Sequence, residues 1–222
     1  NPEMRILLSW SGGKDCAWAL HQLRSQGEVE IAGLLTTFNE AFDRVAMHAV
    51  RSELIRAQAA AAELPLWPVP LPWPCSNAEY EDRMRGVCQR AVASGIAAVA
   101  FGDLFLEDVR AYRERQMATT GLTPLFPLWG QPTAALAQTM LAAGLQAILT
   151  CIDTRRLPPA CAGRDFDAAL LSALPPGVDP CGERGEFHSF VHAGPMFAHP
   201  IPVRRGEQRH DEPFLFTDLL PA

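Results

Sequence analysis

A stretch near the start of the chain places glycines beside groups that bind anions. Ser11-Gly12-Gly13-Lys14 follows an apolar run at residues 4–8 and precedes apolar residues at helical spacing. Two adjacent glycines let backbone N–H groups turn inward, and the start of the following helix adds its positive end. The stretch therefore predicts a strand, a glycine loop and a helix that bind a phosphate or pyrophosphate. A plain glycine turn with a helix cap is the alternative.

A second group of reactive residues lies near the other end of the chain, within residues 179–188. Glu183 and Glu186 are three residues apart, His188 follows two positions later, and glycines lie among them. Such an acidic loop could ligate Mg²⁺, hold a cationic substrate or supply a base near neutral pH. A polar hairpin with glycines at its turns would leave the same pattern, so the spacing keeps both interpretations open.

Strand and helix patterns alternate through the first half of the chain. The predicted strands cover residues 4–8, 30–36, 64–70, 96–101 and 123–127. Prolines indicate that the third of these strands lies at a sheet edge or ends quickly, and Asn77 is predicted to cap the helix that follows it. This alternation predicts an α/β fold, a Rossmann-like parallel sheet with right-handed crossovers and helices on both faces.

Ligands of parallel sheets bind at the carboxyl ends of the strands, and polar residues gather at those ends here. Besides the glycine loop, Thr36-Thr37 lies at the end of the second predicted strand, and Gly102-Asp103 follows the fourth. We therefore expect these strand ends to form one nucleotide pocket.

The pattern changes at residues 128–132, which we take as a boundary between a nucleotide-binding domain, 1–127, and a smaller α+β domain, 128–222. The predicted elements of the second domain are helices at 133–143 and 166–174, a strand at 146–152 and later hairpins. An exposed edge strand in these hairpins would let two copies pair as a homodimer.

Composition excludes several classes of protein. The 222 residues carry a formal net charge of −6, which argues against broad nucleic-acid binding because such binding relies on surplus Lys and Arg. No apolar run approaches the ~20 residues of a membrane helix, and no signal peptide is visible. The six cysteines form no Cys-x-x-Cys pair, which argues against a zinc or iron–sulfur site. We therefore expect a cytoplasmic protein.

The glycine stretch resembles the pyrophosphate loop Ser-Gly-Gly-x-Asp-Ser of the N-type ATP pyrophosphatases. Cys16 replaces the last serine of that motif, and a thiol is a weaker hydrogen-bond donor than a hydroxyl. Over nearly its whole length the chain resembles one branch of these enzymes, the diphthine–ammonia ligase family. The matching segments are 11–16, Met47-His48, 101–107, 127–130 and 182–188. The resemblance implies a parallel-sheet domain of the HUP type and a smaller domain facing its ATP pocket.

The resemblance also implies a reaction and a set of roles. The family uses ATP with Mg²⁺ to adenylate a carboxylate, releases pyrophosphate and lets ammonia form an amide. The residues implied to bind ATP are Ser11, Gly12, Gly13, Lys14, Asp15, Cys16, Thr36, Met47, His48, Gly102 and Asp103, with Asp15 and Asp103 as ligands of Mg²⁺. The residues implied in catalysis are Lys14, for the departing pyrophosphate, and Glu183, Glu186 and His188, for the acceptor and the protons of ammonium. For His48, a helix cap is the alternative to contact with adenine.

The resemblance leaves the acceptor open. The family's named reaction modifies a histidine of elongation factor 2, but the family also has bacterial members and bacteria lack that modification. Two other functions stay open: sulfur transfer after adenylation, which needs a thiol such as Cys161 or Cys181, and nucleotide-binding regulation without turnover. Trp73 and Trp129 would form either an aromatic wall for a trimethylammonium group or ordinary packing.

Overall fold

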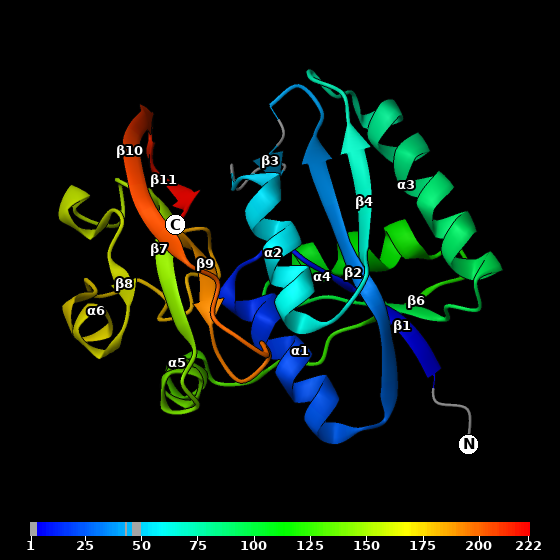
Figure 1. Ribbon diagram of the computed structural model, residues 1–222, viewed down its shortest axis with the longest axis horizontal. Helices are drawn as coiled ribbons and strands as arrows, with labels where there is room; N and C mark the ends of the chain where they lie inside the picture. Colours follow the sequence, from blue (N-terminus) through cyan, green and yellow to red (C-terminus); the bar gives the residue numbers. More distant parts are fainter. Residues whose placement is uncertain (1–3, 43, 46–49) are drawn as a thin grey trace.

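The first half of the chain forms a parallel sheet (Figure 1). The computed structural model describes residues 4–42, 44–45 and 50–222. Across the sheet, the parallel strands found in this described part are β4 (Leu66–Leu71), β2 (Val29–Asn39), β1 (Met4–Ser9), β5 (Ala98–Ala100) and β6 (Thr123–Leu125). A short antiparallel strand, β3 (Arg44–Val45), pairs with the end of β2. The predicted α/β fold is confirmed.

The central position of β1 follows from its apolar side chains on both faces. Ile6 and Leu8 pack into one hydrophobic core and Leu7 into another, and none of the three is more than 1% exposed. β4 lies at an edge of the sheet, as predicted. Pro68 and Pro70 have no backbone N–H, and at an edge this donor is not needed to pair with a further strand.

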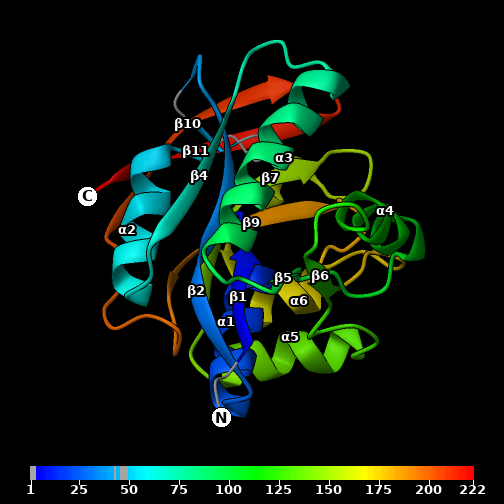
Figure 2. The same ribbon diagram turned by 90° about the vertical axis from the view of Figure 1, so that its right-hand side faces the viewer.

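Helices cover both faces of this sheet. The elements packed on the face of Ile6 and Leu8 are α1 (Lys14–Gln26) and α2 (Ser52–Ala62). The elements packed on the face of Leu7 are α3 (Asn77–Ala93) and α4 (Glu107–Met117). Figures 1 and 2 show α3 on the side of the sheet that faces away from the C-terminal strands. In the described part of the chain, no helix is long and apolar enough to cross a membrane.

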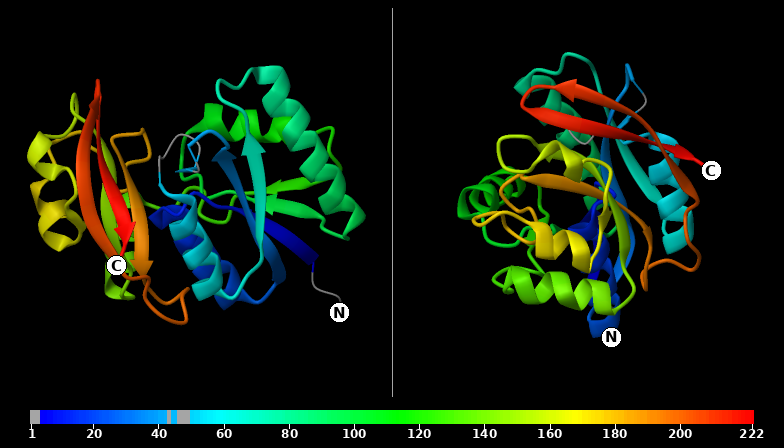
Figure 3. Two further views of the ribbon diagram at one scale, coloured as in Figure 1. Left: turned by 45° about the horizontal axis from the view of Figure 1, so that its top comes forward. Right: turned by 90° about the vertical axis from the view of Figure 1, so that its left-hand side faces the viewer.

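The second half of the chain forms an antiparallel sheet. Its strands are β7 (Gln146–Asp153), β8 (Asp165–Phe166), β9 (Phe187–Ala193), β10 (Val203–Asp211) and β11 (Phe214–Pro221), with β9 and β11 flanking β7 and β10 outside β11. Its helices are α5 (Thr133–Ala142), α6 (Ala168–Ala173) and the 3₁₀ turn η1 (Pro159–Cys161). This sheet packs against α1 and α2 (Figure 3). The apolar side chains of the sheet and of the two helices belong to one hydrophobic core.

Two details differ from the sequence-based expectations. Helix α3 is capped by Ser76, whose Oγ accepts a hydrogen bond from Glu79 N at 3.1 Å and donates to Glu79 Oε1 at 3.0 Å, so Asn77 is the first helical residue and not the cap. β5 is shorter than predicted because its neighbours β1 and β6 pair only with residues 98–100.

Candidate functional site

A cavity of about 690 Å³ opens at the carboxyl ends of the parallel strands. The ends of β1, β2, β4 and β5 contribute to its lining, as do helices α3 and α4 and the loop that precedes β9. This is the position at which parallel sheets bind ligands. The residues singled out from the sequence that line it are Ser11, Gly13, Lys14, Asp15, Cys16, Gly102, Asp103, Glu183 and His188.

The glycine loop is held in place by the C-terminal sheet. Gly12 has a φ of +86°, and a Cβ there would lie 2.9 Å from Gln58 Oε1, so the position requires glycine. The Gly12 carbonyl accepts hydrogen bonds from Val191 N at 2.9 Å and from Gln58 Nε2 at 3.0 Å. At the start of α1, Lys14 N donates to Ser189 Oγ at 3.2 Å. Gly12 does not line the cavity itself. Its hydrogen bonds instead fix the position of the loop.

Gln58 is a residue of α2 that the sequence analysis did not single out. Its side chain is fully buried, accepts a hydrogen bond from Trp10 Nε1 at 2.9 Å and donates to Gly12 O and to Val191 O, the latter at 2.8 Å. It thereby joins the end of β1, the glycine loop and β9. No local pattern could have revealed this role, because its partners lie 46 to 133 residues away along the chain.

Ser11 and Cys16 face each other across the glycine loop. Ser11 Oγ accepts a hydrogen bond from Gly13 N at 3.4 Å, and Cys16 Sγ donates to Gly13 O at 3.2 Å. The two side-chain atoms, Oγ and Sγ, are 3.8 Å apart. Burial raises the pKa of the Cys16 thiol, so the group stays protonated and serves as a donor within the loop.

The Lys14 side chain is buried between the two halves of the chain. This side chain is 3% exposed. Its Nζ donates to the Cys181 carbonyl, lies 3.3 Å from Asp15 Oδ1 and sits 5.1 Å from the centre of the Phe187 ring. Burial acts to lower the pKa of Lys14, but the nearby negative charges, that of Asp15 foremost, outweigh it and hold the pKa above its usual value. The lysine is therefore a fixed, charged group.

The loop after β5 packs directly on the start of α1. A Cβ on Gly102 would lie 3.1 Å from Cys16 N, so a larger residue would displace the backbone of one or the other. Asp103 follows, and its Oδ2 accepts a hydrogen bond from Arg113 Nε at 3.2 Å. The Arg113 guanidinium in turn lies 4.7 Å from the centre of the Phe101 ring. These contacts place the Asp103 carboxylate beside the glycine loop at the cavity wall.

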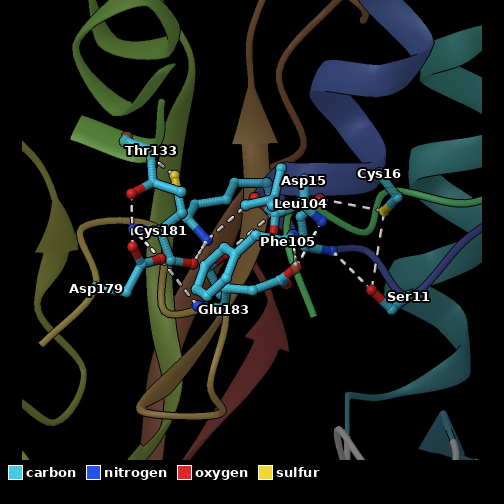
Figure 4. A network of polar contacts seen from close by, with 12 residues as sticks. Ser11, Asp15, Cys16, Leu104, Phe105, Thr133, Asp179, Cys181 and Glu183 are labelled. Atoms are coloured by element: carbon cyan, nitrogen blue, oxygen red, sulfur yellow. Dashed lines mark hydrogen bonds and ion pairs between the residues drawn. The ribbon is translucent and has the colours of Figure 1, made fainter. Parts of the chain in front are cut away.

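Glu183 joins the C-terminal loop to the loop after β5 (Figure 4). Its Oε2 accepts hydrogen bonds from Leu104 N at 2.5 Å and from Phe105 N at 3.0 Å. Burial raises the pKa of this carboxyl, although the two N–H donors act to lower it. The two segments that the sequence analysis singled out at 101–107 and 182–188 are therefore in direct contact.

Asp179 organises the loop that carries Glu183. Its side chain is buried, and its Oδ2 accepts hydrogen bonds from Cys181 N and Glu183 N, both at 3.1 Å. Its Oδ1 accepts from Thr133 Oγ1 at 2.6 Å, which ties the loop to the start of α5 (Figure 4). The sequence analysis placed Asp179 in the acidic segment without assigning it a role.

Comparison with known families agrees with this arrangement. A model described as the diphthamide synthase N-terminal domain matches residues 4–124, and one described as the diphthamide synthase C-terminal domain matches residues 133–219. The chain belongs to the diphthamide synthase family.

Curated relatives extend the likeness beyond the glycine loop. The diphthine–ammonia ligase of Bos taurus is 26% identical over 225 residues, which span 92% of this chain and 84% of that protein. The diphthine–ammonia ligase of Danio rerio is 27% identical over 221 residues, which span 90% of this chain and 86% of that protein. Both halves of the chain, with their two sheets, are therefore included in the likeness.

Not every residue assigned from the family resemblance reaches the cavity. Thr36 is 1% exposed, its Oγ1 donates to Trp10 O at 2.8 Å, and it does not line the cavity, so the structure does not support its assignment to nucleotide binding, which stays a prediction. Its neighbour Thr37 lines the cavity instead, because successive residues of a strand face opposite sides. Met47 and His48 lie outside the described residues.

Glu186 has a structural role in this member of the diphthamide synthase family. Its side chain is fully buried, and its Oε2 accepts a hydrogen bond from Asp179 N at 2.6 Å. It does not line the cavity, so nothing in the site supports the prediction that it contacts the acceptor, which stays a prediction. His188, two residues later, does line the cavity.

The two thiols considered for sulfur transfer are buried. Cys161 is 3% exposed and Cys181 is 1% exposed. Burial raises the pKa of Cys181 to about 12, so the thiolate that would act as a nucleophile is absent near neutral pH. All six cysteines lie in the described part of the chain, and Cys75 is the one that is partly exposed. The sulfur-transfer alternative is therefore not favoured.

The two tryptophans considered for an aromatic wall have different surroundings. Trp73 lines the cavity and is 66% exposed. Trp129 does not line it, and its ring packs against Phe126 and the guanidinium of Arg110, which is 4.8 Å from the ring centre. Trp129 therefore has the packing role that the sequence analysis gave as its alternative.

Asp15 and Asp103 are the two carboxylates beside the glycine loop that could hold a divalent cation. No cluster of three or more metal-ligating side chains occurs among the residues that the structure describes. The Asp15 Oδ1 atom is buried and accepts no hydrogen bond within this part of the chain, although Lys14 lies beside it. Burial raises the pKa of Asp15, and the negative charge of Asp103 adds to that shift. Mg²⁺ commonly takes one or two carboxylates together with phosphate oxygens, and these two aspartates could supply them.

Proposed function

We propose that this member of the diphthamide synthase family is an ATP-dependent, amide-forming ligase of the ATP-pyrophosphatase type. The relatives named above are diphthine–ammonia ligases, and the likeness spans most of both chains. The observation that carries the proposal is the shared cavity, which the glycine loop and the C-terminal loop line together. A nucleotide on the first loop would therefore lie within reach of groups on the second.

The first step activates a carboxylate, whose own leaving group would be oxide. A carboxylate oxygen of the acceptor attacks the α-phosphorus of ATP, the bond to the bridging oxygen breaks, and pyrophosphate leaves with the electron pair. Backbone N–H groups at the start of α1 stabilise the charge that develops on pyrophosphate. Lys14 adds a fixed positive charge at the same end of the cavity. Mg²⁺ held by Asp15 and Asp103 would supply further neutralisation of phosphate charge.

The second step forms the amide. Ammonia attacks the acyl carbon, the bond to the AMP oxygen breaks, and the nitrogen loses a proton. Glu183 and His188 line the cavity and are our candidates for accepting that proton. The raised pKa of the Glu183 carboxyl makes its carboxylate a stronger base than an exposed glutamate, which suits the role. Histidine is a common general base near neutral pH.

The partners of this reaction are ATP, ammonia and an acceptor that carries a carboxylate. A cytoplasmic location, a division of the chain after residue 127 and pairing as a homodimer stay predictions. Nucleic acid is not an expected partner, given the net charge of −6.

The test is product analysis of ATP incubated with Mg²⁺, ammonium and a metabolite pool from a cell extract. The proposal predicts AMP and pyrophosphate, lost in Lys14→Ala and retained in Arg85→Ala, a control at an exposed position on α3. A thermal unfolding scan would establish that Lys14→Ala still folds. Formation of ADP in place of AMP would refute the ligase, and ATP binding without any AMP would favour a nucleotide-binding regulator.

A further inference from the structure

At one end of the cavity, the lining residues that the structure describes are uncharged. Strands β2 and β4 are neighbours, with Asn39 paired to Leu71, and the segments that follow them leave the sheet at the same edge (Figure 1). The described residues that line this end are Asn39, Leu71, Pro72, Trp73, Cys75, Ser76 and Asn77. All are uncharged, whereas the end at the glycine loop carries Lys14 and Asp15.

Two aromatic rings are exposed at this uncharged end. Trp73 is 66% exposed and Phe42 is 57% exposed. Their ring centres are 6.0 Å apart at an interplanar angle of 68°, an edge-to-face contact. Phe42 therefore supports the Trp73 ring without stacking on its face. Large aromatic side chains are usually mostly buried, and exposed apolar clusters at a pocket mark binding sites.

We propose that Trp73, supported by Phe42, is the stacking platform for the adenine base of ATP. The inference rests on the proposed function, since it takes the phosphates to lie at the glycine loop. A base is flat and uncharged, which matches this end of the cavity. Asparagine amides suit the hydrogen-bonding edge of adenine, and Asn39 and Asn77 supply two of them.

The same platform is poorly placed for the acceptor. The acceptor must meet the α-phosphorus within reach of Glu183 and His188, the groups proposed to handle protons. Those groups come from the C-terminal loop, and Glu183 contacts the loop after β5. The ends of β2 and β4 lie beyond β1 from that contact, because β1 separates β2 from β5 in the sheet. The uncharged end is therefore left to the base.

Binding measurements can separate the base from the phosphates. The probes are α,β-methylene-ATP, which cannot release pyrophosphate, and inorganic tripolyphosphate, which has no base. Trp73→Leu should weaken α,β-methylene-ATP about tenfold or more, while tripolyphosphate binds as to the wild type. Trp73→Phe keeps a flat ring and should retain most of the affinity. Quenching of tryptophan fluorescence by α,β-methylene-ATP should be smaller in Trp73→Phe than in the wild type.

Each outcome decides the matter. Equal affinity of the wild type and Trp73→Leu for α,β-methylene-ATP would overturn the inference, as would an equal loss of tripolyphosphate binding. Failure of the wild type itself to bind α,β-methylene-ATP would instead overturn the proposed function, and this inference with it.

Discussion

Replacement of Gln58 tests how the glycine loop is held. Gln58→Leu replaces the amide with an apolar side chain that is one atom shorter and removes three hydrogen bonds, to Trp10, Gly12 and Val191. The two bonds to the Gly12 and Val191 carbonyls contribute about 1 kcal/mol each, and leaving the buried Trp10 N–H without a partner costs about 1–3 kcal/mol, which together amount to about 3–5 kcal/mol. Gly12 O keeps its hydrogen bond from Val191 N, so the loop would loosen and not collapse.

The assay combines thermal unfolding with titration of α,β-methylene-ATP. For a chain of this length we expect a fall in Tm of about 10 °C, since each kcal/mol shifts Tm by about 2–4 °C. ATP-analogue affinity should fall as well, because the N–H groups of the loop lose their fixed orientation. Gln89→Leu, at an exposed position on α3, should change stability by no more than about 0.5 kcal/mol.

A charged variant sharpens the same test. Gln58→Glu keeps an acceptor for Trp10 but cannot donate to the carbonyls of Gly12 and Val191, and it buries a charge beside them. It should be less stable than Gln58→Leu. The role assigned to Gln58 would be refuted if both variants had a free energy of unfolding within about 1 kcal/mol of that of the wild type and bound the ATP analogue equally well.

Three further predictions follow from single contacts. Gly102→Ala should weaken α,β-methylene-ATP binding in calorimetry, because its Cβ would lie 3.1 Å from the α1 backbone. Gly86→Ala is the control: a Cβ there has no heavy atom within 4 Å, and alanine should stabilise α3 by up to about 1 kcal/mol. Lys14 is the only lysine in the sequence, and because it is buried and its pKa is raised, mass spectrometry should find it unmodified by an amine-acylating reagent at mildly alkaline pH; rapid labelling of the native protein would contradict its position. Burial acts to raise the pKa of Asp218. The guanidinium groups of Arg51, 2.8 Å from Oδ2, and of Arg44, 3.1 Å from Oδ1, outweigh it and hold the pKa below its usual value. Asp218→Asn should therefore lower Tm at pH 7. The difference from the wild type should shrink as the pH falls below the usual aspartate pKa of about 3.9 and disappear below the lowered pKa of the folded state, because the protonated aspartate no longer contributes; a difference in Tm that does not change with pH would contradict the ion pairs.

Local sequence patterns were sufficient for the sheet and for the position of the cavity. An apolar run such as 4–8 can be satisfied only by burial on both faces, and the glycines after it can only begin a loop. Because parallel strands end at one edge of a sheet, Gly102-Asp103 could be assigned to the same cavity as the glycine loop without knowledge of any contact. Both segments do line it.

Side-chain direction was a different matter, because it depends on partners far away in the sequence. Thr36 and Thr37 are the same residue type and differ only in which face of β2 they occupy. The sequence analysis assigned nucleotide binding to Thr36, whose side chain is the buried one. Glu186 has the same charge as Glu183, yet its carboxylate holds the Asp179 N–H while that of Glu183 binds the loop after β5. Nothing in their spacing distinguishes the two.

The packing of the C-terminal sheet against α1 and α2 explains these outcomes. It brings the Cys181 carbonyl to Lys14 and Val191 to the Gly12 carbonyl, across 167 and 179 residues of sequence respectively. It also turns Gln58 from an ordinary helical residue into the link between three elements. The location of strands and loops along the chain can be predicted from local residue patterns, whereas the orientation of a polar side chain depends on which distant group satisfies its hydrogen bonds once water is excluded.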